Sequence, residues 1–483
     1  MIELAGFAPD ADATAPGVIT DCTDFIPYTN GMEGAPSAVT PSGTPALGAA
    51  CLGAGVVTDL SGNRRIISGT TANLYELTGG SWVDRTRGTT YTGGADTRWS
   101  ITQFGNATLA SNKSDTIQRS SSGAFADIAS APKAEIIFSV GAFVMALNVN
   151  DGADKPDGWA CCAAYDETSW SPSITTQAAN GRLVATAGAL TAGMRLGEYA
   201  VAYKEKSIYL GQYVGAPSVW NWIQVPGGEA GCVGKEALCD IGGAHFFVGQ
   251  DNFWIFDGTR PMPIADNVLR QWFYDNSNPG YRYRIKCVFD RQNNRVWVFY
   301  PGNGSTTCNQ ALVYHLISKK WGRVTRSMEA ALNYIAPGVT IDTLSSVAST
   351  IDTLPDISYD SQYWLSGGQA LSLFNTSHQL QMMTGASASS SFTTGDAGDD
   401  DSVMLLKQLR LRFAAGYAPT SASVQAYSKM TSGGSLTTGS SGTMNDGKFD
   451  ILKAARWHRA RFDFTGPVRV TQIDAKMQEA GLR

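Results

Sequence analysis

The sequence has little charge and no run of basic residues. Charged residues make up 16% of its 483 residues, and 37 Lys and Arg against 42 Asp and Glu leave a net charge of −5. Ordinary soluble domains carry about 25% charged residues. Proteins that bind DNA conventionally present a basic face. This composition therefore excludes a conventional DNA-binding protein.

Long apolar runs and a basic N-terminal segment are also missing. No Lys or Arg precedes Arg64, whereas a secretory signal begins with a positive region before an apolar one. The longest nearly apolar stretch, residues 136–149, is interrupted by Ser139, Gly141 and Asn148. It is shorter than the ~18–20 residues that a spanning helix needs. We therefore expect a soluble protein made in the cytosol, without membrane insertion.

Motifs for metal, phosphate or nucleophile chemistry are absent. The eight cysteines form no C-x-x-C pair, and only Cys161 and Cys162 are adjacent, so we expect buried, reduced thiols. Neither G-x-x-x-x-G-K-[ST] nor G-x-S-x-G occurs. We expect no cofactor, no metal and no catalytic residue. Packed or solvated side chains, rather than ligands or bases, are expected at His245, His315, His378 and His458.

What the sequence does contain is aromatic and periodic. Its 12 Trp, 18 Tyr and 19 Phe indicate a folded chain. Short apolar runs occur in pairs, each pair split by a polar turn rich in Asn, Asp and Gly, which predicts β-hairpins. The continuously apolar second runs, such as 253–256, indicate burial on both faces. The paired runs are 66–67 with 74–77, 108–110 with 116–117, 143–147 with 159–162, 199–203 with 207–210, 245–248 with 253–256, 287–289 with 296–300 and 363–365 with 370–374.

The spacing of these pairs predicts an all-β fold of the β-propeller type. A strand-only unit of ~40–50 residues is the period of a propeller blade. Six blades fit best and seven are possible, with no helical interlude between units; a plain antiparallel sandwich is the alternative. Large rings follow many hairpins and are expected to pack each blade against its neighbour. These rings are Trp82, Phe125, Trp170, Trp220, Trp222 and Trp321.

The two ends of the chain differ from its middle. We expect residues 1–60 to form an extended N-terminal arm and part of a platform, 61–385 the propeller with loop insertions, and 386–483 the C-terminal β part of the platform. The Gly/Ser/Thr run 433–442 predicts a flexible loop. Strands that alternate Arg with apolar residues, at 409–413 and 457–464, should have one wet face that meets another subunit.

Acidic residues give the only site candidates. A glycosidase needs a carboxylate pair, for which the candidates are Asp166, Glu167, Asp251, Asp290 and Asp360, although most fit hairpin turns equally well. Two clusters lie in loops without the twelve-residue calcium-loop spacing. They are Asp151, Asp154 and Asp157, and Asp396, Asp399, Asp400 and Asp401.

The two ends also carry a family resemblance. The segments 4–10 (LAGFAPD), 30–37 (NGMEGAPS), 456–462 (RWHRARF) and 480–483 (AGLR) resemble the nozzle proteins of podovirus tails. These proteins of short-tailed bacteriophages are also called tail hub or packaged-DNA stabilisation proteins. The resemblance implies a six-bladed propeller and a platform built from both chain ends. It also implies a homo-hexamer below the portal and its adaptor ring, which continues the DNA ejection channel and retains packaged DNA. No catalytic residues come with the family.

The charge suits such a conduit. An acidic wall repels phosphates over a Debye length of ~8–10 Å, so a duplex stays centred and slides. We therefore expect Asp399, Asp400 and Asp401, with Asp396, to lie near the channel or the adaptor contact. The expected partners are further copies, the adaptor, tail fibres or tailspikes, and genomic double-stranded DNA passing without sequence-specific binding. The expected location is the virion tail, assembled in the host cytoplasm. The alternative is a carbohydrate-binding or glycan-hydrolysing propeller.

Overall fold

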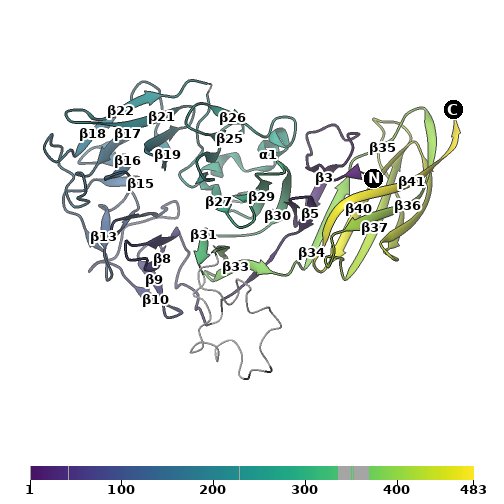
Figure 1. Cartoon of the computed structure of the whole chain (residues 1–483), viewed down its shortest axis with the longest axis horizontal. Helices are drawn as coiled ribbons and strands as arrows, with labels where there is room; N and C mark the ends of the chain where they lie inside the picture. Colours follow the sequence, from purple (N-terminus) through teal and green to yellow (C-terminus); the bar gives the residue numbers. More distant parts are fainter. Residues whose placement is uncertain are drawn as a thin grey trace.

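The computed structural model describes residues 2–41, 43–227, 229–335 and 369–482, together with Thr350 and Asp352. Within these residues the chain is nearly all-β and forms two bodies, a propeller and a platform (Figure 1). The described part contains one α-helix, α1 (Arg270–Asn276), followed by a 3₁₀ helix, η1 (Pro279–Arg284). The expectation of no helical interlude is therefore wrong at this point. No helix in the described ranges combines the length and apolar character needed to cross a bilayer.

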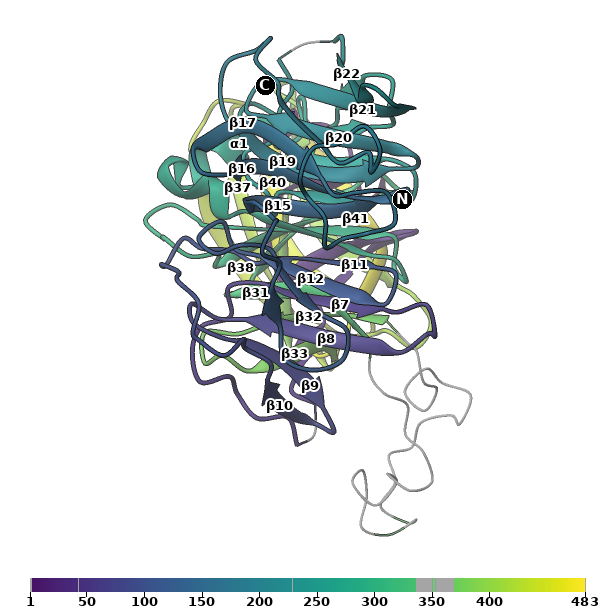
Figure 2. The same ribbon diagram turned by 90° about the vertical axis from the view of Figure 1, so that its left-hand side faces the viewer.

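Six self-contained four-stranded antiparallel sheets form blades of the propeller (Figure 2). The first two are β7 (Ala54–Thr58), β8 (Arg64–Gly69), β9 (Leu74–Thr78) and β10 (Ser81–Asp84), and β11 (Ser100–Phe104), β12 (Ala107–Ser111), β13 (Gln118–Ser120) and β14 (Ala126–Asp127). The next two are β15 (Lys133–Val140), β16 (Phe143–Asn150), β17 (Asp154–Cys161) and β18 (Ala179–Arg182), and β19 (Leu190–Leu196), β20 (Tyr199–Lys204), β21 (Ile208–Gly215) and β22 (Val219–Gln224). The last two are β23 (Leu238–Asp240), β24 (His245–Val248), β25 (Phe253–Phe256) and β26 (Pro261–Pro263), and β31 (Ala330–Ile335), β32 (Gln369–Phe374), β33 (Leu380–Gly385) and β6 (Ser37–Val39).

A further four-stranded unit stands in the same ring but continues into the platform. It consists of β27 (Lys286–Asp290), β28 (Arg295–Tyr300), β29 (Gln310–His315) and β30 (Trp321–Thr325). The innermost strands β7, β11, β15, β19, β23, β27 and β31 contact one another in a closed circle. The propeller prediction is confirmed. Six is the number of self-contained blades, and seven is the number of four-stranded units around the axis.

The predicted hairpins lie where the blades need them. In four of the first five blades each predicted pair covers the second and third strands, as in β24 and β25, where Phe246 pairs with Ile255. In the second blade 108–110 lie in β12, but 116–117 precede β13. Residues 287–289 and 296–300 become β27 and β28. The predicted run 363–365 lies outside the described residues. The strand that pairs with 370–374 on its inner side is β31, with Ala331 opposite Leu373.

The ring is closed by a strand from the N-terminal arm. Val39 of β6 pairs with Met382 of β33, so the outermost strand of the last blade comes from the start of the chain. The first blade begins at Ala54 with β7, inside the segment 1–60. The first sixty residues therefore supply the outermost strand of the last blade, β6, and the innermost strand of the first blade, β7.

Large rings join neighbouring blades, as the sequence predicted. Trp82 of β10 packs 5.7 Å from Phe374 of β32, across the closure of the ring. Trp222 of β22 lies 5.7 Å from Trp159 of β17 in the preceding blade. Trp321 of β30 lies 5.1 Å from Phe253 of β25. In each case a ring on the outermost strand covers the blade before it.

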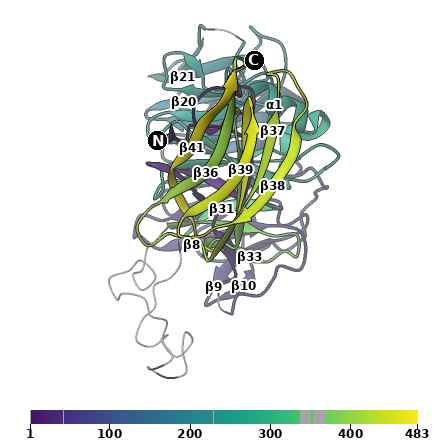
Figure 3. The ribbon, with the colours of Figure 1, turned by 90° about the vertical axis from the view of Figure 1, so that its right-hand side faces the viewer.

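The platform is a pair of packed β-sheets built from both ends of the chain. In one sheet, β4, β5, β41, β36 and β39 extend the β27–β30 unit, and β1 pairs with β41 (Figure 3). The other sheet has the order β2-β3-β34-β40-β37-β38, with β35 against β40. The N-terminal strands are β1 (Ile2–Glu3), β2 (Gly6–Phe7), β3 (Val18–Thr23), β4 (Phe25–Tyr28) and β5 (Gly31–Gly34). The C-terminal strands are β34 (Ser389–Thr394), β35 (Ala397–Gly398), β36 (Ser402–Phe413), β37 (Ser421–Lys429), β38 (Thr437–Thr443), β39 (Lys448–Ala455), β40 (Trp457–Thr465) and β41 (Arg469–Leu482).

The predicted flexible loop at 433–442 is partly wrong. Thr437–Thr443 form β38, an edge strand whose Ser441 pairs with Gln425 of β37. Threonine and serine are accepted on a solvated sheet edge, where backbone pairing rather than apolar burial holds the strand. Composition alone could not show this pairing.

Propeller and platform share one apolar core. Phe25 of β4 stacks 5.1 Å from Phe392 of β34, in the same buried cluster as Phe253 and Trp321 of the propeller. Such shared burial favours a fixed arrangement over independent domains, because separating the two bodies would expose this apolar surface.

Candidate functional site

Asp396, the first residue of the predicted acidic site, is a buried structural carboxylate. It lies between β34 and β35 and is 6% exposed. It accepts from Lys429 Nζ at 2.8 Å and from Arg459 Nε at 2.8 Å. Burial alone would raise the pKa of Asp396, but these two cations outweigh it and hold the pKa below its ordinary value. Asp396 therefore ties β37 and β40 to the start of the loop.

The three following aspartates have different surroundings. Asp399 caps its own turn by accepting from Ser402 N at 2.6 Å. Asp400 accepts from Trp457 Nε1 at 2.6 Å and from Ser432 N at 3.0 Å. The turn leads into β36, whose Ser402 pairs with Leu482, so the acidic loop lies beside the C-terminal end of β41 (Figure 1). Asp399, Asp400 and Asp401 are exposed there, and Asp396 is not.

The other acidic candidates are separated from one another. Asp151, Asp154 and Asp157 each face their own cation, at 2.8 Å from Lys155, Lys113 and Arg182 respectively. Asp166 caps a turn through Thr168 N, whereas Glu167 binds Arg119 Nε at 2.7 Å. Asp290 accepts from Asn293, and Asp360 lies outside the described residues. Within the described ranges, no group of three or more His, Cys, Asp and Glu side chains is arranged to hold a metal.

The histidines and thiols are mainly packing groups. His245, His315 and His458 are buried, and burial lowers the pKa of each. His378 instead contacts Glu329 Oε1 through Nδ1 at 2.7 Å. All eight cysteines are buried free thiols, as the sequence predicted.

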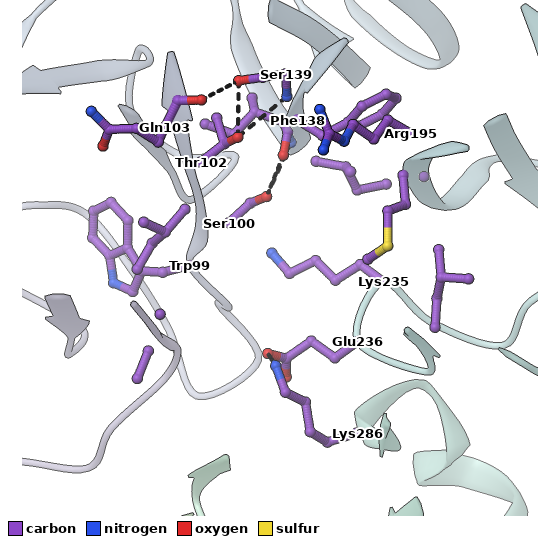
Figure 4. Close-up of a pocket in the computed structure, with 18 residues that line it drawn as sticks. Trp99, Ser100, Thr102, Gln103, Phe138, Ser139, Arg195, Lys235, Glu236 and Lys286 are labelled. Carbon is purple, nitrogen blue, oxygen red and sulfur yellow. Dashed lines mark hydrogen bonds and ion pairs between the residues drawn. The ribbon is translucent and has the colours of Figure 1, made fainter. Parts of the chain in front are cut away.

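The propeller axis holds a cavity of about 490 Å³ that was not predicted from the sequence. The inner strands of six consecutive four-stranded units line it, from β7 to β27. Hydroxyl groups join two of these strands: Ser100 Oγ donates to Ile137 O at 3.1 Å, and Thr102 Oγ1 lies 3.1 Å from Ser139 Oγ. Figure 4 shows these hydroxyl groups across the cavity from Lys235, Glu236 and Lys286, with Arg195 near Phe138.

Three of the four charged residues that line the cavity are cations: Arg195, Lys235 and Lys286, against Glu236. Lys286 Nζ lies 2.7 Å from Glu236 Oε1. Lys286 and Arg98 lower the pKa of Glu236 against the opposing effect of burial, so this carboxylate stays ionised. Lys235 reaches back to Glu135, with Nζ 3.0 Å from Oε1. Lys235 and Glu236 precede β23, and Lys286 is the first residue of β27. No sequence motif surrounds these three positions.

Arg195 differs from the other cations of the cavity. Its side chain is exposed to the cavity and makes no hydrogen bond or ion pair with the part of the chain that the structure describes. Its carbonyl oxygen is held by His245, whose Nε2 donates at 3.0 Å. The other ring nitrogen of His245 then accepts from Tyr203 Oη at 2.8 Å. These two hydrogen bonds therefore hold the backbone at Arg195 in place, while the Arg195 guanidinium has no hydrogen-bond partner among the described residues.

Comparison with known proteins gives no family. No protein family model matches the chain, and no curated protein matches it. A solved structure described as YCF48 bound to D1 peptide is 11% identical, with a TM-score of 0.35, and the match covers 62% of this chain and 86% of that chain. The computationally designed Ika8 protein is 10% identical, also with a TM-score of 0.35, and the match covers 71% of this chain and 99% of that one. Sequence identities and TM-scores this low support no inference about activity or partners.

Proposed function

We propose that this chain is a structural subunit of a short phage tail, a nozzle protein that forms a six-membered ring below the adaptor and lines the DNA exit channel. The observation that carries the proposal is the platform. It is assembled from both chain ends and is continuous with a propeller unit through the pairing of Arg323 with Phe25. This matches the architecture that the resemblance of the two termini implies.

The platform also has the features of a docking surface. Between its sheets lies a largely apolar groove of about 260 Å³, whose lining includes Ile2, Leu4 and Met477. Gly398, next to the exposed Asp399, lines the same groove. An apolar centre beside exposed charge is the usual anatomy of a subunit interface. We assign the groove to a neighbouring subunit of the ring and the carboxylates to the channel or the adaptor contact.

The charge of the chain supports passage of DNA rather than its capture. At −5 per chain, a ring of six would carry −30. Each phosphate contact made by Lys or Arg adds affinity through counterion release, which would slow ejection. Exposed carboxylates such as Asp399 and Asp401 instead repel phosphates, which lowers the affinity of the channel for DNA.

The central cavity bears on the enzymatic alternative. Among the described residues that line it there is one carboxylate, Glu236, and Lys286 holds it ionised. Retaining and inverting glycosidases need a second carboxyl group at a defined separation, one of the two being protonated. The lining therefore favours a structural role.

Electron microscopy of the purified full-length protein, mixed with the adaptor of the phage that encodes it, tests the proposal. We expect six-fold rings seated on the adaptor through the platform. Replacing Asp399 and Asp401 with Lys should increase retention of double-stranded DNA by these rings, most strongly at low salt. The matched control is the same change at Asp251 and Asp257, which are exposed on the propeller. The proposal would be overturned if the protein stays monomeric and does not bind the adaptor, or if it hydrolyses host glycans.

A further inference from the structure

We infer that the central cavity of the propeller is a binding site for a small oxyanion, a carboxylate or phosphate group carried by a low-molecular-weight ligand. The inference goes beyond the proposed tail function and does not depend on it. It rests on the juxtaposition of Arg195, Lys235 and Lys286 in one cavity of about 490 Å³.

The cavity is positive although the protein is acidic. Lys286 is matched by Glu236 at 2.7 Å and Lys235 by Glu135 at 3.0 Å. Arg98 also approaches Glu236, at 3.9 Å, so this carboxylate is shared between two cations. Arg195 has no counter-ion among the described residues. Positive charge is therefore left over inside a recess, where low-dielectric walls focus the field on an entering anion.

Arg195 is suited to bind such an anion. A guanidinium presents a planar fork of donors that fits carboxylate and phosphate oxygens in pairs. The backbone of Arg195 is positioned by the chain Tyr203–His245–Arg195 O, in which every link is buried or part-buried. A free cation on a fixed strand loses little conformational freedom in the backbone when a ligand binds.

The neighbouring strands β11 and β15 add short polar side chains to the apolar ones in the cavity lining. Ser100, Thr102 and Ser139 cross-link β11 and β15 through their hydroxyl groups. Ser139 Oγ donates to the backbone carbonyl of Gln103, whose side-chain amide points away from the hydroxyl groups (Figure 4). The oxygen atoms of Ser100, Thr102 and Ser139 retain lone pairs, which suits a ligand with hydroxyl groups next to its anionic group. A sugar acid and inorganic phosphate both carry an oxyanion for Arg195. Only the sugar acid also has carbon-bound hydroxyl groups for the polar side chains of β11 and β15.

Isothermal titration calorimetry on the full-length protein at low ionic strength tests the site. The probes are inorganic phosphate and glucuronate, with glucose as the neutral comparison. We expect saturable binding of at least one anion at one site per chain, weakened by salt, and no binding of glucose. Binding of glucuronate alone assigns an acidic sugar, and binding of phosphate alone or of both anions assigns the oxyanion itself. Glucose binding as tight as glucuronate, or no saturable binding of either anion, would overturn the inference.

Arg195→Gln separates this site from general charge effects. The side chain is exposed and without partners in the described structure, so the variant should keep the wild-type circular dichroism spectrum and melting temperature. We expect at least tenfold weaker anion binding, and none for Arg195→Glu. The control Arg64→Gln removes an exposed arginine from β8, outside the cavity lining, and should leave binding unchanged. Equal loss in both Gln variants, or in neither, contradicts the assignment.

Discussion

Glu33 of β5 and Arg295 of β28 form a 2.5 Å ion pair that joins the platform to the propeller. The second oxygen of Glu33 accepts from Arg469 Nε at 2.6 Å, and the guanidinium of Arg469 lies over the ring of Tyr417 at 3.7 Å. Arg295 is 4% exposed. One carboxylate therefore compensates two cations at the place where the two bodies meet.

Replacing Glu33 with Gln should weaken this junction. The change leaves the buried Arg295 without a counter-ion, and breaking a buried pair from one side costs about 3–5 kcal/mol. We expect a lower melting temperature in scanning calorimetry and faster proteolysis between platform and propeller. Glu198→Gln, at an exposed position in the β19–β20 turn, is the matched control. Equal melting of the two variants would contradict the role of Glu33.

Within the acidic loop, one aspartate should matter for stability and two should not. Asp396→Asn leaves Lys429 and Arg459 facing a neutral amide, so we expect the free energy of unfolding to fall by about 3 kcal/mol or more. Asp399→Asn and Asp401→Asn change exposed side chains and should leave the urea midpoint of unfolding at the wild-type value. Urea denaturation followed by tryptophan fluorescence measures all three. A similar loss at each position would show that the loop acts as a unit.

Stability should decline as the pH falls below neutrality, in part because of His245. Burial lowers the pKa of His245 from an ordinary 6.5, so the unfolded chain binds the proton more readily than the folded one. Its contribution is therefore complete above about pH 6.5 and is lost as the pH falls from there toward the folded pKa. We expect His245→Gln to flatten the dependence of melting temperature on pH between 7 and 5. An unchanged profile would exclude His245 as a source of that dependence.

The thiols should be unreactive in the folded protein. Burial raises the pKa of Cys161 to about 11 and that of Cys162 to about 12, and the other six thiols are also buried with a raised pKa. Only the thiolate reacts readily with disulfide reagents. We expect fewer than one of the eight cysteines to react with such a reagent in native conditions and all eight in denaturant. Rapid labelling of the native adjacent pair would contradict this.

The sequence predicted the hairpins because their determinants are local. In His245–Val248 and Phe253–Phe256, both strands and the turn lie within twelve residues, and residues 246–248 and 253–256 are apolar without a break. The ring closure was not predicted, because Ser37–Val39 is a short outer strand whose partner is far along the chain. No local pattern in Pro- and Gly-rich sequence identifies such a partner.

The cavity was not predicted for a related reason. Arg195, Lys235 and Lys286 come from three different units and have unremarkable neighbours in sequence. Only closure of the ring brings them together. In the acidic loop the sequence predicted one site where the structure has two environments. Asp396 is buried between Lys429 and Arg459, whereas the three following aspartates are exposed. The sequence did not show this difference, because both cations lie far along the chain.

The use of the first residues of the chain to finish both bodies has a consequence for biosynthesis. Strand β6 finds its partner only when β33 has left the ribosome, and β5 finds β41 later still. The nascent chain must therefore carry β6, and the free edge of the local β4–β5 hairpin, without these partners while the inner blades form. We expect that polypeptides released early, before the codons for β41, cannot complete the platform, because both β5 and β36 would lack this partner strand.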